Sequence, residues 1–258
     1  MFALSVASVY AERHARMDAL LRVEAGGLLS RGRNELVARF MDTCTAEWLL
    51  MVDSDEQLSL DAFDKLIEAV HDKDRPIMAG LYFGAWPGEF YPTAVPLIFN
   101  RVEGSTRFLP VMDYPTDKVI RVDSAGTGCL LIHRRVFEAF QADASPHQGK
   151  TWCWFQDMPV NQDWLSEDHF FCARAIELGF PIHAHTGVIL PHRKRFWLTE
   201  ETFPTRGGLM GVQSVESLKR ALKAALSRGD ATRAAVLKAE LDRVGNPPKE
   251  KAEGRSTT

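Results

Sequence analysis

The sequence predicts an α/β domain followed by a helical hairpin, and three observations carry this prediction. Helical and strand-like patterns of apolar residues alternate over the first 83 residues. The run Trp48–Val52 is wholly apolar and has the length of a buried strand. After Ser214 the apolar residues change to helical spacing on both sides of a turn signal, Arg228-Gly229-Asp230. We therefore expect an α/β domain over residues 1–207, a helical hairpin over 208–244 and a disordered tail over 245–258.

The individual elements follow from periodicity and from residues that begin helices. Apolar residues three and four apart indicate helices, and a preceding serine can accept hydrogen bonds from the first turn, as Ser30 and Ser59 can. Short alternating or continuous apolar runs indicate strands. The expected helices cover residues 2–16, 30–40, 59–70, 135–140 and 166–178. The expected strands cover residues 20–23, 48–52, 76–83, 95–100, 108–111, 119–122, 129–133 and 182–190. Residues 142–162 have no period and predict a surface loop or lid.

Composition excludes several classes of protein. The formal net charge of −3 argues against general nucleic-acid binding, because such proteins carry a basic excess or a basic stripe. No apolar stretch has the length of a membrane span. The four cysteines lack a paired C-x-x-C spacing, which argues against a zinc knuckle or a dithiol redox motif. The apolar start of the chain lacks a basic leader segment, so we expect a helix there and a cytoplasmic protein.

Two carboxylates one residue apart, Asp53 and Asp55, directly follow the apolar run of residues 48–52. Open α/β sheets bind their ligands at the carboxyl ends of strands, which is where this pair is expected. Two close anions repel each other, and a hard divalent cation that bridges a diphosphate relieves this repulsion. The alternative is a simple turn held by the aspartate side chains.

Two later clusters suit the same site, and each has a structural alternative. Glu167 and Asp168 follow Ser166 at the expected start of a helix, where acidic residues complement the helix dipole or act as catalytic carboxylates on a rigid element. His192 comes directly after an expected strand and is a candidate metal ligand. Most of the eight histidines must nevertheless be surface or satisfied core groups.

Three further groups of residues are functional candidates only if the acidic clusters and His192 form one site. Arg33 and Asn34 can reach a nucleotide or support Asp53 through a charge-assisted hydrogen bond. The glycines of Gly126-Thr127-Gly128 permit the close approach of a ligand, or simply a bulge. A group of aromatic residues can pack a loop or stack on sugar rings: Trp152, Trp154, Phe155 and Trp164.

Together these motifs resemble the ordered signature of family 2 glycosyltransferases with the GT-A fold, of the short type found in phages and bacteria. The resemblance covers about residues 1–195, and its most specific part is Asp53-Ser54-Asp55 with the later Glu167-Asp168. It implies a single GT-A domain with a mixed central sheet. It also implies an inverting hexosyltransferase-like enzyme that moves a sugar from a nucleotide diphosphate donor, here a UDP-sugar, to a hydroxyl of a glycan or other acceptor.

The resemblance also implies roles for the residues that match it. Asp55 and His192 are expected to coordinate Mn²⁺ or Mg²⁺, with Asp53 on the ribose or metal side of the nucleotide. Asp168 is expected to be the general base for the acceptor hydroxyl, and Glu167 to orient the acceptor. The donor side is expected to include Arg33, Asn34, Asp53, Gly126, Thr127, Gly128 and Arg193.

One departure from the family pattern leaves alternatives open. Family members begin with a strand whose following loop holds the nucleobase, whereas this chain starts within the helix expected after it. Either the start is placed too late, the site is completed differently, or donor binding has been lost. The last case predicts a non-catalytic GT-A-like module that binds a glycan or a partner. A nucleotidyltransferase is disfavoured, because no glycine-rich phosphate loop occurs near the start. The apolar faces of the hairpin can pair two copies into a homo-oligomer.

Overall fold

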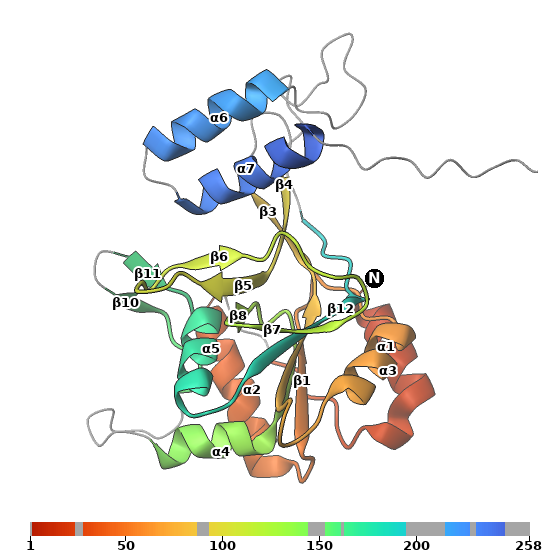
Figure 1. Ribbon diagram of the computed structural model, residues 1–258. Coiled ribbons are helices and arrows are strands. Elements are labelled where there is room, and N and C mark those ends of the chain that lie inside the picture. Colours follow the sequence, from red (N-terminus) through yellow and green to blue (C-terminus); the bar gives the residue numbers. More distant parts are fainter. Residues whose placement is uncertain are drawn as a thin grey trace, which may run out of the picture. The chain divides into compact units, whose positions relative to one another are not determined.

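The computed structural model describes residues 2–23, 28–86, 93–143, 153–160, 163–194, 215–227 and 231–245 (Figure 1). The chain divides into two compact units. One comprises Met1–Gly88 and Pro92–Trp197, and the other comprises Glu89–Tyr91 and Leu198–Thr258. In the described residues the first unit is a mixed α/β domain and the second is a pair of helices.

A five-stranded mixed sheet forms the centre of the first unit. Its strands are, in spatial order, β1 (Trp48–Val52), β9 (Cys129–His133), β2 (Ile77–Leu81), β12 (Ile182–Ile189) and β7 (Val119–Val122). β12 is parallel to β2, β9 is antiparallel to β1 and β2, and β7 is antiparallel to β12. β1, β2 and β12 therefore run in the same direction, so their carboxyl ends meet at one end of the sheet. The expected α/β class with a mixed central sheet is confirmed.

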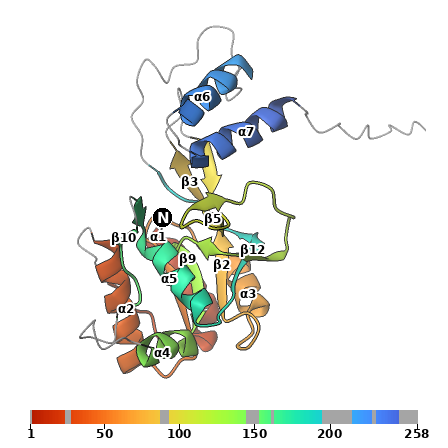
Figure 2. The same ribbon diagram turned by 60° about the vertical axis from the view of Figure 1, so that its left-hand side comes forward.

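Helices cover both faces of the sheet. On one side lie α2 (Leu29–Thr43), α4 (Arg134–Ala142) and α5 (Glu167–Glu177), and on the other lies α3 (Leu60–Ala69) (Figures 1 and 2). α1 (Phe2–Arg13) and the 3-10 turn η1 (His14–Arg16) precede them, and Val9 of α1 packs into the core on the α3 side. Alternation along β1 serves both layers, because Leu49 and Met51 face α2 while Trp48, Leu50 and Val52 pack on the α3 side.

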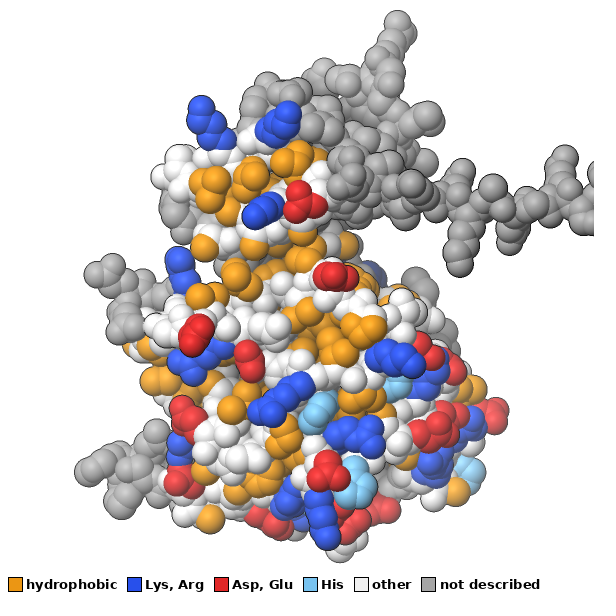
Figure 3. Space-filling model, viewed as in Figure 1, with side chains coloured by type: hydrophobic (Ala, Val, Ile, Leu, Met, Phe, Trp, Pro, Cys, Tyr) orange, Lys and Arg blue, Asp and Glu red, His pale blue; other side chains and the backbone are white. Residues whose placement is uncertain are grey.

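Short strands follow the central sheet at its carboxyl end. β2 continues through Tyr82 into β3 (Phe83–Trp86), which pairs with β4 (Thr93–Pro96). β5 (Ile98–Arg101) lies between β6 (Phe108–Pro110) and β8 (Ser124–Ala125), and β10 (Met158–Val160) pairs with β11 (Asp163–Leu165). On the face shown in Figure 3, acidic and basic side chains of the first unit are interspersed rather than gathered by sign.

Three local expectations need correction. Residues 20–23 form no strand, and the side chain of Leu20 is 62% exposed beside the sheet instead of contributing to it. Ser30 lies inside α2, whose N-cap position is Leu28, whereas Ser59 caps α3 as expected by accepting from the Ala62 amide at 3.1 Å. The expected surface loop of residues 142–162 contains core residues, because Trp154 and Phe155 are each 1% exposed. Residues 144–152 and 161–162 are outside the described chain.

In its described residues the second unit is made of two helices, and the expected domain boundaries at residues 207 and 244 stay predictions. α6 (Val215–Ser227) packs against α7 (Ala231–Gly245), and the apolar contact consists of Leu218, Ala225, Ala234 and Leu237. The turn at residues 228–230 and the expected tail after Gly245 lie outside the described residues. Across the described ranges, every helix falls short of the length and apolar character that crossing a bilayer requires.

Tyr82 packs closely against the loop between β8 and β9. Its hydroxyl accepts a hydrogen bond from the Gly128 amide at 2.9 Å, and its ring is buried against that loop. A Cβ at Gly128 would lie 2.7 Å from Cζ of Tyr82, and a Cβ at Gly126 would collide chiefly with the Tyr82 hydroxyl. Both glycines are thus required by close packing against Tyr82, whereas the sequence had offered the approach of a ligand or a bulge.

This packing predicts a selective rescue. Gly126→Ala and Gly128→Ala should each lower the free energy of unfolding by about 1–3 kcal/mol, as overpacking does. Tyr82→Phe removes the atom that blocks Gly126, so it should reduce the cost of Gly126→Ala. It should reduce the cost of Gly128→Ala less, because a Cβ there also lies 2.7 and 2.9 Å from ring carbons of Tyr82. Urea unfolding of the single and double variants measures how much Tyr82→Phe reduces the cost of each glycine substitution. An equal reduction at the two glycines would contradict this account.

Candidate metal centre

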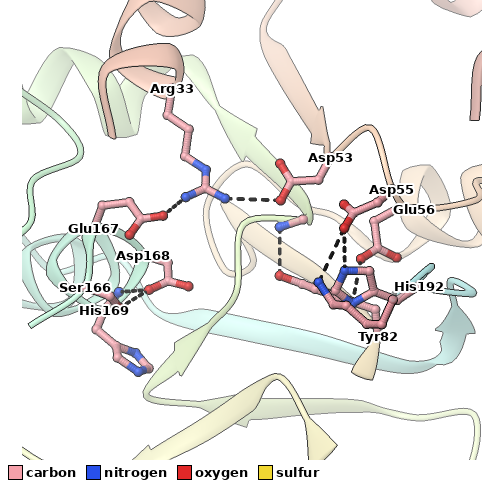
Figure 4. Close-up of polar contacts among 12 residues, drawn as sticks. Arg33, Asp53, Asp55, Glu56, Tyr82, Ser166, Glu167, Asp168, His169 and His192 are labelled. Carbon is pink, nitrogen blue, oxygen red and sulfur yellow. Dashed lines mark hydrogen bonds and ion pairs between the residues drawn. The ribbon is translucent and has the colours of Figure 1, made fainter. Parts of the chain in front are cut away.

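Two backbone hydrogen bonds join the loops that follow β1 and β12. The Gln57 amide donates to the Pro191 carbonyl at 3.0 Å, and the Arg193 amide donates to the Asp55 carbonyl at 2.8 Å. They form an antiparallel bridge between Glu56 and His192. The expected convergence of the Asp55 carboxylate with the imidazole of His192 is therefore present, and Figure 4 shows the two side chains together.

The imidazole of His192 is held at both ring nitrogens. Nδ1 lies 2.7 Å from the Phe83 carbonyl, which can only accept, so Nδ1 carries a proton. Nε2 lies 3.0 Å from Oδ2 of Asp55. The ring also packs edge-to-face on Tyr82, with centroids 5.4 Å apart. This arrangement fixes the ring orientation and directs Nε2 toward the carboxylate, as the outer hydrogen bonds of metal-binding histidines do.

Two basic side chains, His192 and Lys194, contact the Asp55 carboxylate. Lys194 Nζ is 3.3 Å from Oδ2, the same oxygen that His192 contacts. Partial burial alone would raise the pKa of Asp55, but the hydrogen bond from His192 and the charge of Lys194 outweigh it, so the pKa is lowered. Asp55 is therefore ionised at neutral pH and available as a ligand.

Glu56 is the residue that sequence reasoning missed. It is 1% exposed, and in the described chain both carboxylate oxygens are buried without a hydrogen-bond partner. Oε1 lies 3.3 Å from Nδ1 of His192, whose proton is engaged by Phe83. Burial, with the nearby charges of Asp55 and Asp53, raises the pKa of Glu56 to about 8. The available signal was a third acidic residue directly after the Asp53-Ser54-Asp55 turn.

Asp55, Glu56 and His192 form a candidate metal site. Each offers a ligand atom, and these atoms lie within 4.8 Å of one another. Two carboxylates with one imidazole suit a hard or borderline divalent cation. The carboxylate oxygens of Glu56 are buried without a hydrogen-bond partner among the described residues, and a bound cation would supply that partner. The donor set therefore fits a metal ion, but it does not determine which metal. Asp53, also expected as a ligand, is outside this cluster.

Arg33 connects Asp53 to the start of α5. Its guanidinium is buried, contacts Oδ2 of Asp53 at 3.3 Å and forms an ion pair with Oε1 of Glu167 (Figure 4). Support of Asp53 by Arg33 was one of the two expected roles. Glu167 is buried against Arg33, and its expected role in orienting an acceptor stays a prediction.

Asn34, the next residue on α2, contacts the backbone of residues 154–155 instead of the acidic residues. Its Oδ1 accepts from the amides of Trp154 and Phe155 at 2.9 and 3.0 Å, and its Nδ2 donates to the Phe155 carbonyl at 2.7 Å. The amide thus attaches residues 154–155 to α2. Its expected contact with a nucleotide stays a prediction.

Asp168 is placed at the first turn of α5 and is held through one oxygen. Oδ1 accepts from the Ser166 hydroxyl and from the His169 amide, the latter at 2.8 Å. Ser166 occupies the N-cap position, but its hydroxyl donates to Asp168 and makes no capping bond to the helix. His169 stacks on Phe108 and contacts Oγ of Ser124 at 2.7 Å, which fixes this turn against β6 and β8. The expected role of Asp168 as general base stays a prediction.

The remaining candidates lie around the same end of the sheet. Gly126, Thr127 and Gly128 are buried, and Oγ1 of Thr127 has no hydrogen-bond partner among the described residues. Arg193 is exposed next to the bridge. Their contacts with a donor stay predictions. Of the aromatic group, Trp154 and Phe155 are core residues, Trp164 is 70% exposed, and Trp152 is outside the described chain.

Comparisons with known proteins do not show a family for this chain. No family model matches it, and no curated protein matches it. A crystal structure of A197 from STIV aligns with 15% sequence identity and a TM-score of 0.40, over 66% of this chain and 69% of that chain.

The buried Glu56 predicts a pH dependence of stability. Its ordinary pKa is 4.5 and its folded value is about 8, so between these values the folded state keeps a proton that the unfolded state releases. The free energy of unfolding should therefore fall as pH rises through this window, by at most about 1.4 kcal/mol per pH unit from this group.

Glu56→Gln should remove this contribution and flatten the decline. Urea unfolding without divalent cations at several values between about pH 5 and pH 8 measures the slope. Glu103→Gln, at an exposed position, is the matched control and should keep the slope of the unaltered protein. Parallel slopes in all three proteins would contradict the assignment of a buried, protonated Glu56.

Proposed function

We propose that this protein is a metal-dependent, inverting glycosyltransferase with a GT-A-like domain, which moves a sugar from a nucleotide diphosphate donor to an acceptor hydroxyl. The observation that carries the proposal is the cluster of Asp55, Glu56 and His192 at the joined carboxyl ends of β1 and β12. This position is where open α/β sheets bind ligands. The resemblance of the motifs to family 2 glycosyltransferases supports the choice of reaction.

The proposal gives each side chain a separate task. Asp55, Glu56 and His192 would hold Mn²⁺ or Mg²⁺, and the cation, when bound, supplies charge neutralisation for a departing diphosphate. Asp53 contacts the ribose side of the nucleotide, a position for which Arg33 holds its carboxylate. Arg193, exposed beside the bridge, reaches a phosphate oxygen.

Asp168 serves as the general base. Hydrogen bonds from Ser166 and from the His169 amide fix its Oδ1, so Oδ2 receives the proton of the acceptor hydroxyl as that oxygen attacks the anomeric carbon. Attack from the side opposite the leaving diphosphate inverts the configuration at that carbon. Glu167 is anchored by Arg33 and positions the first turn of α5 for this step.

Donor binding can be tested by calorimetric titration of the full chain with UDP in the presence and absence of Mn²⁺. We expect binding that requires the cation and is lost in Asp55→Ala, because this variant removes one carboxylate ligand. Asp42→Ala, an exposed aspartate near the other end of α2, is the control and should bind as the unaltered chain does. UDP binding that is indifferent to both Mn²⁺ and Asp55 would refute the proposed metal role.

The base assignment has its own test. Asp168→Asn should lower sugar transfer by about 10²–10⁴-fold, the usual contribution of a general base, and leave Mn²⁺-dependent UDP binding intact. The assay follows UDP release from several UDP-sugars over a panel of oligosaccharide and protein acceptors, with Asp42→Asn as the control. Full turnover by the Asp168→Asn protein would exclude this residue as the base.

A non-catalytic glycan-binding module is the second candidate, and one observation favours it. Trp164 on β11 is 70% exposed, and an exposed indole is a suitable surface for stacking on a sugar ring. This candidate predicts binding of oligosaccharides that Trp164→Ala weakens, with neither UDP binding nor UDP release. The UDP titration and the UDP-release assay therefore separate the candidates.

A further inference from the structure

The outer edge of β1 lines a cavity that is separate from the candidate metal centre. β1 is the first strand of the central sheet, and in the described chain no strand pairs with its outer side. A cavity of about 440 Å³ lies along it, and Asp55, Glu56 and His192 are not among its lining residues. It is lined by four of the five residues of β1: Trp48, Leu49, Leu50 and Val52.

The hydrogen-bonding register of β1 shows which of its backbone groups face this cavity. The Arg134 amide donates to the Glu47 carbonyl at 2.7 Å, and the Asp53 amide donates to the Gly128 carbonyl at 3.0 Å, so residues 47 and 53 bond toward β9. Bonding alternates along an antiparallel strand, so Leu49 and Met51 also bond toward β9. The N–H and C=O groups of Trp48, Leu50 and Val52 therefore point to the outer edge.

The cavity has apolar walls on both faces of the sheet. Leu21, Leu36 and Phe40 line it on the α2 side, and Val9 and Phe63 line it on the side of α1 and α3. The strand edge is therefore recessed between two layers of side chains. An occupant must be narrow, must be apolar on two opposite sides, and must carry a row of donors and acceptors between them.

We propose that the outer edge of β1 binds an extended peptide segment of a partner protein, which adds a sixth strand to the sheet. The outward N–H and C=O dipoles of Trp48, Leu50 and Val52 require a complementary row of opposite partial charges, and an extended backbone carries such a row at the same spacing. Successive side chains of a strand point to opposite faces, so alternate apolar residues of the segment enter the two walls.

Two other occupants fit these features less well. A small apolar molecule would bury the outward backbone groups without hydrogen bonds, which costs free energy for each group. A second copy of this chain presents the same recessed edge between the same protruding walls, and two such concave edges do not interlock. A single strand satisfies both the polar floor and the apolar walls.

Peptide display against the full chain tests the proposal. We expect a library of random 12-residue peptides to yield sequences with apolar residues at every second position. The best of these, made synthetically, should slow hydrogen exchange at the amides of Trp48, Leu50 and Val52, as resolved by NMR. The amides of Leu49 and Met51 already donate within the sheet, so they serve as internal controls for an intact β1.

Leu50→Pro and Leu50→Ala form the matched pair of variants. Proline removes the outward N–H at position 50 and leaves the bonds to β9 in place, a position where strands tolerate it. Peptide affinity should fall about tenfold more in Leu50→Pro than in Leu50→Ala, which is about 1.4 kcal/mol. Ala19→Trp places a large ring at an exposed residue of the cavity wall, outside the sheet, and should also weaken binding without disturbing β1.

Several outcomes overturn the proposal. One is a library that yields no alternating peptides, and another is a peptide that binds Leu50→Pro as tightly as Leu50→Ala while Ala19→Trp has no effect. Self-association of the chain that Leu50→Pro disrupts would show that a second copy occupies the edge. An apolar dye that binds the cavity equally in all variants, with no peptide bound, would show a small-molecule site.

Discussion

The candidate site depends on one constraint, the backbone bridge between the loops after β1 and β12. Its two hydrogen bonds use main-chain atoms, so they bring together segments that are 137 residues apart whatever side chains those segments carry. The parallel directions of β1 and β12 make the bridge feasible, because both strands deliver their carboxyl ends to the same place. Asp55, Glu56 and His192 then need only short side-chain adjustments to meet.

α2 supports this arrangement through two consecutive residues. Arg33 joins the end of β1 to the start of α5, and Asn34 holds the backbone of residues 154–155. A buried guanidinium is tolerated because two carboxylates compensate its charge, and removing either would leave it with one partner only. α2 therefore fixes Asp53 and Glu167 relative to the core.

Periodicity and strand-end rules predicted the framework of the first unit. The apolar run before Asp53 and the strand before His192 were long and bounded, and burial on both faces enforces such patterns. Residues 20–23 had a similar apolar pattern but form no strand. A strand needs a neighbouring strand to pair with, and the local sequence does not show whether one is present. Trp154 and Phe155 were expected in a surface loop because no periodicity reveals an isolated segment that inserts into the core.

Side-chain partnerships were predicted less well than backbone positions. Glu56 was missed because its burial arises from the bridge to His192, a contact between distant segments. Ser166 stands at the expected helix start, yet its hydroxyl serves Asp168, since a nearby carboxylate competes with the backbone as an acceptor. Arg33 was placed beside Asp53 by sequence reasoning, but its second partner, Glu167, is on an element 134 residues away.

The charge distribution of this end of the sheet has a consequence for the sequence of binding events. Asp53, Asp55 and Glu167 share Arg33 and Lys194 as their basic contacts, and Asp168 adds a further carboxylate at the start of α5. With Arg193 also exposed beside the bridge, these four carboxylates outnumber the three basic side chains by one, so this end of the sheet attracts cations and repels a bare diphosphate. Under the proposed function, the metal ion must arrive before the nucleotide or in complex with it.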